Sequence, residues 1–158
     1  MEEETYLKEI EKNKGIIIKV VHLYADDPED RKDLYQEIIY QSWKSYGNFK
    51  GESKFSTWLY KVSLNIALTF LTKKKKLSSL RDELPLPDNN SDSVNSDRTD
   101  YLYRAITQLA EIDRAVIMLH LDGYANDEIS EMMGISKNHT GVKLHRIRQQ
   151  LTTLLNNK

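Results

Sequence analysis

Apolar residues recur at three- and four-residue spacing along most of the chain, which indicates amphipathic helices. In the N-terminal half this pattern predicts helices over about 5–24, 28–46 and 55–76. In the C-terminal half it predicts helices over 98–110, 112–121, 125–133 and 136–155. We therefore expect an all-α chain.

Capping and breaking residues support these limits. Pro28 follows acidic residues and suits the first position of the second helix, and Gly47-Asn48 should end that helix. Ser56 or Thr57 is expected to cap the third helix, which ends at the lysine run 73–76, where the helix dipole favours positive charge.

The same reading predicts which side chains are buried. On the second helix the expected buried face is Leu34, Ile38, Ile39 and Trp43, and on the third it is Trp58, Leu59, Val62, Ile66 and Phe70. The opposite face of the second helix carries Asp33, Gln36, Glu37 and Tyr40 at i, i+3, i+4 and i+7. Spacing alone favours a solvated face for this polar stripe over a docking surface.

Residues 77–97 differ in composition, being rich in Ser, Asp, Asn and Pro. Such a composition is typical of a flexible acidic linker. We therefore expect two small helical domains, 1–76 and 98–158, joined by this segment.

The C-terminal domain ends in a pattern typical of a helix-turn-helix. Asn126 or Asp127 is expected to cap its third helix, Gly134 to end that helix, and Ser136 to cap the next one. In such a motif the second helix enters the major groove of DNA. The side chains expected near the bases are Lys137, Asn138, His139 and Thr140, with Lys143, Arg146 and Arg148 further along.

Residues 49–76 combine a Gly/Ser/Lys loop, aromatic residues, Asn65 and a basic end. That mixture suits single-stranded or melted nucleic acid, because bases stack on aromatic rings while lysines hold phosphates. Most of the aromatic residues belong by their spacing to the core. The loop, Asn65 and the lysines remain as candidates for binding a ligand.

Charge is divided along the chain in a way that the net value of −1 conceals. Residues 41–76 hold eight lysines and one acidic residue, and residues 135–158 hold five Lys or Arg and no acidic residue. The rest of the chain is acidic. Two separated basic segments can contact phosphate while the acidic surfaces meet a protein partner.

Other features of the sequence argue against catalysis and secretion. The chain has no cysteine, and its histidines (His22, His120, His139 and His145) show no metal-binding spacing. We find no phosphate-binding Gly-rich loop and no nucleophile-base set, so we expect neither an enzyme nor a cofactor or metal. An acidic start without a secretory pattern, and no apolar run of about 20 residues, favour a cytoplasmic protein.

Two motifs resemble those of a known family. Residues 33–37 read DLYQE, similar to the pattern D-L-x-Q-E, and residues 49–65 read FKGESKFSTWLYKVSLN, similar to F-R-G-x-S-x-F-x-T-W-L-Y-R-I-A-x-N. Residues 128–136 and 144–148 add weaker similarity. From about Gly15 to Leu155 the chain resembles the extracytoplasmic-function (ECF) group of bacterial sigma factors, which have only sigma-70 regions 2 and 4.

The resemblance implies an alternative sigma factor that binds core RNA polymerase and promoter DNA and helps to melt the start site, with an anti-sigma factor as a further partner. It also implies that the polar stripe Asp33, Gln36, Glu37 and Tyr40 is a polymerase-binding surface and not a solvated face. The implied minus-ten DNA residues are Lys50, Gly51, Glu52, Ser53, Lys54, Phe55, Ser56, Lys61, Asn65, Lys73 and Lys74. The implied minus-thirty-five DNA residues are Ser136, Lys137, Asn138, His139, Thr140, Lys143, Arg146 and Arg148.

Two alternatives stay open at this point. A stand-alone helix-turn-helix regulator would bind duplex DNA as a dimer and leave residues 49–76 without a purpose. An interaction module that occupies polymerase without contacting DNA would leave the basic segments unexplained. The recognition helix also departs from the family, because Gly141 replaces a longer side chain and lowers helix propensity by about 1 kcal/mol relative to Ala.

Overall fold

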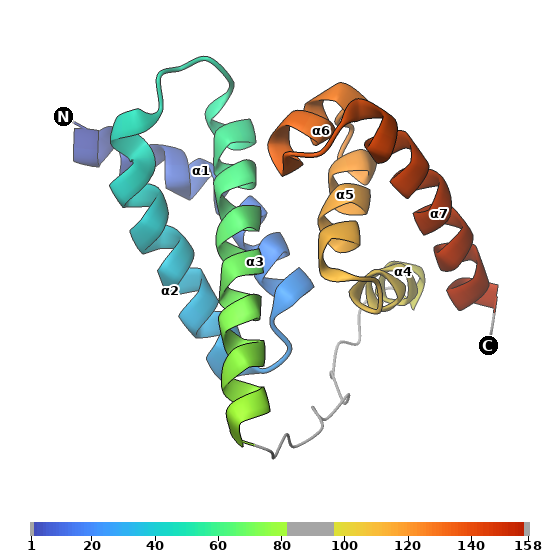
Figure 1. The fold of residues 1–158 in the computed structure, drawn as a ribbon. Helices are drawn as coiled ribbons and strands as arrows, with labels where there is room; N and C mark the ends of the chain where they lie inside the picture. The colour runs from blue at the N-terminus through green and yellow to red at the C-terminus, as the bar shows by residue number, and fades with distance from the viewer. Residues whose placement is uncertain (1, 82–96, 157–158) are drawn as a thin grey trace. The chain divides into compact units, whose positions relative to one another are not determined.

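The computed structural model describes residues 2–81 and 97–156, with side chains over 2–77 and 100–156 (Figure 1). Every regular element in these ranges is a helix, which confirms the predicted all-α class. The helices form two compact units, one within Met1–Pro87 and one within Asp88–Lys158. Most of the predicted linker, residues 82–96, lies outside the described residues.

The N-terminal unit contains α1 (Glu2–Tyr24), α2 (Pro28–Ser45), the short 3-10 helix η1 (Tyr46–Asn48) and α3 (Phe55–Arg81). The helices α1 and α2 both pack against α3, and a loop joins η1 to α3 (Figure 1). Fully buried side chains from all three long helices form the core: Ile17, Val20, Leu23, Leu34, Ile38, Leu59 and Leu64.

The start of α2 follows the sequence prediction. Asp27 is its N-cap and Pro28 its first residue, and Asp27 Oδ1 accepts a hydrogen bond of 2.8 Å from the backbone N–H of Asp30. This hydrogen bond, which favours the charged carboxylate, is the main cause of a lowered pKa for Asp27. The cap therefore fixes where the chain turns from α1 into α2.

The third helix differs from the prediction in its N-cap and in its end. It begins at Phe55, with Trp58 N–H donating to the Lys54 carbonyl at 3.1 Å, so Ser56 and Thr57 lie inside the helix and neither caps it. It also continues past the lysines to Arg81. Residues 73–76 are good helix formers, and no Gly or Pro occurs before Arg81 to stop the helix.

Side-chain burial on α2 also differs from the prediction. Leu34 and Ile38 are fully buried, but Ile39 is only half-buried and Trp43 keeps 39% of its surface exposed. Trp43 packs at the edge of α1, where its ring lies 5.0 Å from that of Tyr6. The pattern of apolar residues identified the helix but overestimated the width of its buried face.

The C-terminal unit contains α4 (Asp97–Thr107), α5 (Glu111–Leu121), α6 (Asn126–Met133) and α7 (Lys137–Asn156). These limits lie within three residues of those predicted. The core is built from residues of all four helices: Ala105, Ile106, Val116, Leu119, Ile129, Leu144, Ile147 and Leu151.

The turn between α6 and α7 has the expected helix-turn-helix chemistry. Gly134 ends α6 in the left-handed region, with φ of 70°, and Ser136 Oγ accepts a hydrogen bond of 3.1 Å from His139 N–H at the start of α7. At the other end of α6 the N-cap is Ala125, not Asn126 or Asp127. Its backbone N–H donates to Glu128 Oε1 at 2.9 Å, so a glutamate reaching back replaces the predicted cap.

Within residues 2–81 and 97–156, no helix has the length and apolar character needed to span a bilayer.

Candidate functional site

The loop 50–54, which leads into α3, is fully exposed. Gly51 takes a positive φ of 73°, a conformation that a side chain at this position would strain. The Lys54 carbonyl accepts the first helical hydrogen bond of α3. Apart from that bond, the hydrogen bond found within the loop in the described structure is long, from Ser53 Oγ to the Lys54 carbonyl at 3.4 Å. Most of its backbone amides and carbonyls can therefore meet a ligand.

A cluster of aromatic rings lies at the two ends of this loop. We call Tyr46, Phe49, Phe55 and Trp58 the aromatic base; their ring centroids lie 5.3 to 6.1 Å apart. Phe49 precedes the loop and Phe55 follows it, and Phe55 is only 8% exposed. The ring of Phe55, which the sequence placed among the DNA-contacting residues, is thus packed inside the protein in this structure.

The exposed face of α3 continues from the loop. Lys61 and Asn65 are both exposed and stand one helical turn apart, and Lys73 lies two turns further along the helix. Asn65 offers its side-chain amide outward, while its backbone carbonyl accepts a hydrogen bond of 3.0 Å from Thr69 Oγ1. An amide with a cation one turn away and another further along the helix can recognise a polar base edge and the backbone beside it.

Lys74 is engaged within the protein. Its ammonium forms an ion pair with Asp30 at the start of α2, a residue 44 positions away in sequence. A phosphate that binds Lys74 must therefore compete with this carboxylate. Local sequence gives no signal of such a pair.

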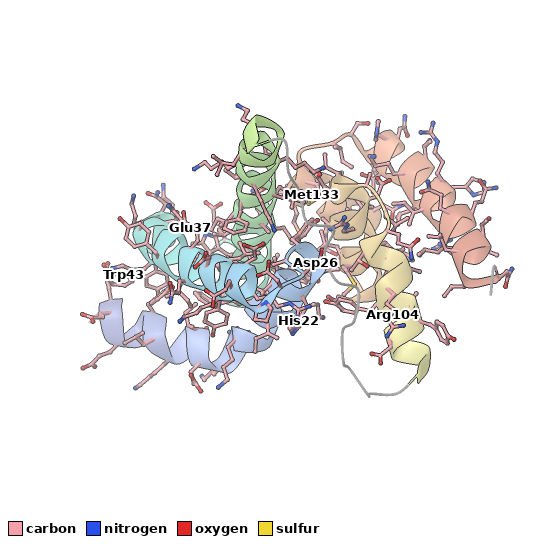
Figure 2. All side chains as sticks on the ribbon, turned by 90° about the horizontal axis from the view of Figure 1, so that it is seen from below. His22, Asp26, Glu37, Trp43, Arg104 and Met133 are labelled. Carbon is pink, nitrogen blue, oxygen red and sulfur yellow. The ribbon has the colours of Figure 1, made fainter. Side chains whose placement is uncertain are left out.

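The polar stripe on α2 remains open. Asp33, Gln36 and Tyr40 are exposed, with Tyr40 at 56%, and Glu37 is half-buried and accepts a hydrogen bond of 3.0 Å from Gln41 Nε2. One turn beyond Tyr40 lies the exposed edge of Trp43, which the sequence had assigned to the core (Figure 2). Its position three residues after Tyr40 is the signal that could have placed it beside the stripe.

The start of α7 presents part of the predicted DNA-contacting set. Ser136, Lys137, Asn138 and His139 are exposed. Thr140 is fully buried, and its Oγ1 donates to the Ser136 carbonyl at 3.0 Å. Thr140 therefore stabilises the first turn of α7 on the side that faces the core.

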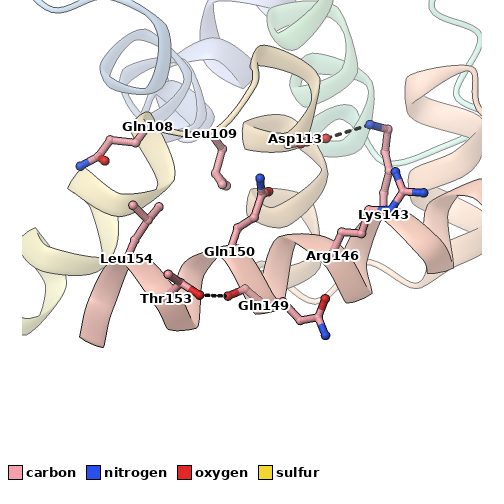
Figure 3. A pocket seen from close by; sticks show the side chains of 9 residues that line it. All are labelled: Gln108, Leu109, Asp113, Lys143, Arg146, Gln149, Gln150, Thr153 and Leu154. Carbon is pink, nitrogen blue, oxygen red and sulfur yellow. Dashed lines mark hydrogen bonds and ion pairs between the residues drawn. The ribbon is translucent and has the colours of Figure 1, made fainter. Parts of the chain in front are cut away.

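Further along α7, two of the three predicted cations have partners within the unit. Lys143 Nζ lies 2.8 Å from Asp113 Oδ1 on α5, and Arg148 Nη2 lies 2.7 Å from His120 Nε2. Arg146 is exposed and lines an open groove between α7 and the segment 108–113, together with Gln149, Gln150 and Thr153 (Figure 3). Val142, whose apolar side chain would suit the core, is 51% exposed on this helix.

The described residues contain no group of three His, Cys, Asp or Glu side chains arranged to hold a metal ion.

Comparison with known families identifies both units. The model for sigma-70 region 2 matches residues 10–77, and that for sigma-70 region 4 matches residues 99–151. The two matches together span most of the chain and divide it between the N-terminal and C-terminal units.

Individual sigma factors show the same relation. The chain is 25% identical over 137 residues to the ECF RNA polymerase sigma-E factor of Haemophilus influenzae, covering 77% of this chain and 72% of that one. It is 24% identical over 147 residues to ECF sigma factor SigE of Mycolicibacterium smegmatis, covering 88% and 57%. The RNA polymerase sigma-H factor of Pseudomonas aeruginosa is 35% identical over 60 residues, covering 38% and 29%. The chain thus spans between about a third and three quarters of the length of these relatives.

Solved structures show a similar fold at low identity. Sigma factor RpoE in complex with the anti-sigma factor NepR, from Bartonella quintana, matches with a TM-score of 0.81 at 15% identity, over 98% of this chain and 99% of that one. CnrH in complex with the cytosolic domain of CnrY matches with a TM-score of 0.66 at 16% identity, over 98% and 89%. With both of its regions matched, the chain belongs to the sigma-70 family of RNA polymerase sigma factors, in the extracytoplasmic-function group.

Proposed function

We propose that this protein is an alternative sigma factor, which binds core RNA polymerase, recognises minus-ten and minus-thirty-five promoter elements and promotes melting of the start site. The observation that carries this proposal is the exposed loop 50–54, held on an aromatic base and continued by Lys61 and Asn65 on α3. A stand-alone regulator of duplex DNA has no use for such a surface.

The loop and α3 suit an unpaired base of the minus-ten element. Opening a duplex costs a few kcal/mol for each unstacked base, which polar contacts to the base edge must offset. The exposed backbone of loop 50–54 and the amide of Asn65 supply donors and acceptors, and Lys61 and Lys73 supply charge for the phosphates. Phe55 contributes by supporting the loop and not by stacking on the base, because its ring is buried.

The polymerase contact is assigned to α2. Asp33, Gln36 and Tyr40 present charged, amide and aromatic groups on one exposed face, with Glu37 at its edge. Trp43 extends this surface by one turn and adds an aromatic residue, the type that is enriched at protein interfaces. We therefore include Trp43 in the proposed polymerase surface.

The minus-thirty-five contact is assigned to α7. Lys137, Asn138 and His139 lie exposed in the first turn, where a recognition helix meets base edges, and Arg146 lies exposed further along. Lys143 and Arg148 approach DNA with part of their donor capacity already used by Asp113 and His120. Thr140 acts from inside the helix.

The proposal includes a protein inhibitor, because the sigma factor RpoE of Bartonella quintana was solved with an anti-sigma factor. We place the protein in the cytoplasm, where its polymerase acts. We propose no catalytic step, metal or cofactor of its own.

The test uses reconstituted holoenzyme and DNA fragments selected by that holoenzyme from a random library. We expect selected fragments to bind the holoenzyme more tightly when the minus-ten segment is pre-melted, and the free protein to bind them weakly. Asn65→Ala should weaken pre-melted binding about tenfold, in line with the 1–3 kcal/mol of a specific polar base contact. Asn13→Ala, the same substitution on α1, is the matched control and should leave binding unchanged.

Tight binding of duplex DNA by the free protein, with no effect of core polymerase, would replace the sigma factor proposal with a stand-alone helix-turn-helix regulator.

A further inference from the structure

Tyr46 is the central residue of the aromatic base. Tyr46 lies in η1, between the end of α2 and the loop 50–54. Its ring packs against rings on both sides of that loop and on all three long helices of the unit: Tyr6 at 5.3 Å, Trp43 at 6.3 Å, Phe49 at 6.1 Å, Phe55 at 6.1 Å and Trp58 at 6.1 Å. Every other ring of the cluster has fewer of these partners.

The loop depends on its ends for its shape. It has no secondary structure, all of its residues are exposed, and the hydrogen bond found inside it in the described structure is long. Phe49 and Phe55, at its two ends, meet edge to face at 5.8 Å, and Tyr46 packs against both. Aromatic pairs of this geometry stabilise beyond the area that they bury. Tyr46 therefore adds a third ring to the direct contact between the two ends of the loop.

Tyr46 also connects the loop to the helix that carries the polar stripe. Its ring is stacked on that of Trp43, with an angle of 20° between their planes, and Trp43 is 39% exposed beside Tyr40. Trp43 in turn packs on Tyr6, whose hydroxyl hydrogen-bonds to the Ile39 carbonyl and to Ser42 Oγ, both on α2. Ring contacts thus run without a gap from the proposed polymerase surface to the loop.

We infer that Tyr46 is a positioning residue, which sets the conformation of loop 50–54 through the aromatic base and so determines how strictly the minus-ten base is selected. The inference rests on the proposed function for its second half only, because the effect on the loop is a property of the free protein. The ring matters and the hydroxyl does not, since no hydrogen bond of the Tyr46 hydroxyl is found among the described residues.

The first experiment tests the loop in the free, full-length protein. Trypsin cleaves after Lys50 and Lys54, and cleavage requires the loop to adopt an extended form in the protease. Tyr46→Leu should raise the initial cleavage rate at these sites about fivefold to tenfold, the lower end of what losing its two aromatic pairs at the ends of the loop, with Phe49 and Phe55, would give. Tyr46→Phe should cleave like the wild type, and so should Tyr35→Leu, the same change at a half-buried tyrosine of α2 outside the cluster.

The second experiment measures base selectivity in the holoenzyme. Pre-melted fragments carry the selected minus-ten base or each of the three others, and the ratio of affinities gives the selectivity. Tyr46→Leu should reduce this ratio about fivefold while Tyr46→Phe restores it, and affinity for core polymerase should change less than twofold. Unfolding by circular dichroism checks that the variant is folded; if Tyr46→Leu does not fold, Phe49→Leu is used with the same two readouts.

The outcomes separate the two proposals. Absence of any selected motif with wild-type holoenzyme overturns the proposed function and leaves the cleavage result to decide the role of Tyr46 in the loop. A normal motif with unchanged selectivity and unchanged cleavage in Tyr46→Leu overturns the inference about Tyr46. If Tyr46→Leu lowers the affinity for all four bases by the same factor, so that the ratio of affinities is unchanged, the inference is overturned as well. A residue that only stabilises the fold would give that result.

Discussion

The ion pair between Lys143 and Asp113 allows a quantitative prediction about the C-terminal unit. Lys143 Nζ lies 2.8 Å from Asp113 Oδ1, and the two side chains are 23% and 16% exposed. Exposed ion pairs contribute about 0.2–1 kcal/mol. Because this pair is mostly withdrawn from water and its hydrogen bond is charge-assisted, we expect a coupling free energy near the upper end, about 1 kcal/mol.

A double-mutant cycle on the full-length protein measures this coupling. Lys143→Met and Asp113→Asn should each lower the free energy of unfolding of the unit by about 1 kcal/mol, and the double variant should lose little more than either single one. Hydrogen exchange of the amides of α5, whose residues 115–119 are buried, reports the unfolding of this unit alone.

The chain offers a matched comparison in the pair of Lys14 and Glu11 on α1. Its N–O distance is similar, 2.9 Å, but its side chains are 52% and 73% exposed. The same cycle there, read from hydrogen exchange of α1, should give no more than about 0.5 kcal/mol. Equal couplings for the two pairs would refute the reasoning, because Lys143 would then be as free as a surface lysine and DNA would have no carboxylate to displace.

Three further predictions concern stability. Gly141→Ala should stabilise the C-terminal unit by about 0.5–1 kcal/mol in thermal unfolding, because Gly141 is helical and an added Cβ meets only Asn126 Nδ2 at 3.9 Å; a loss would contradict the open site. Asp27→Ala should cost about 1 kcal/mol at pH 7 by removing the cap of α2. Because the folded-state pKa of Asp27 is lowered, its contribution is present above the ordinary value of 3.8 and disappears as the pH falls through the folded pKa, so the variant and wild type should converge in acid. Ser63→Ala should stabilise the N-terminal unit by about 1 kcal/mol in urea unfolding, because Ser63 Oγ is buried with no hydrogen-bond partner in the described structure; a clear loss would mean that the hydroxyl is satisfied in solution.

The sequence predicts the helices of the C-terminal unit closely because each one carries its own local signals. Gly134 and Ser136 mark the turn by conformational preference and by a cap that spans three residues. The N-cap of α3 is predicted less well. The ring of Phe55 packs on that of Phe49 and the helix already includes Phe55, so tertiary packing overrides the capping preference of Ser56.

The candidate site was predicted as a set of positions, and its side-chain partners were not. Thr140 was grouped with the neighbouring residues that face DNA, but its side chain is buried. A helix that enters a groove of DNA also packs against its own unit, so some residues of its first turn face the core. Lys143 pairs with Asp113, thirty residues away in the sequence, and the periodicity of either helix does not predict this contact. Local pattern gives the face of a helix, whereas pairing between distant residues requires the folded chain.

The ion pair between Lys74 and Asp30 affects how the affinity for DNA depends on salt concentration. Binding of DNA is strengthened by the release of small ions from phosphates, and each lysine–phosphate contact steepens the dependence on salt by roughly 0.7 to 0.9 in the logarithmic slope. Where Asp30 already neutralises Lys74, the phosphate displaces a carboxylate of the same protein, and that carboxylate must be hydrated or find another cation. The lysine run 73–76 should therefore contribute less affinity in dilute buffer than its formal charge suggests.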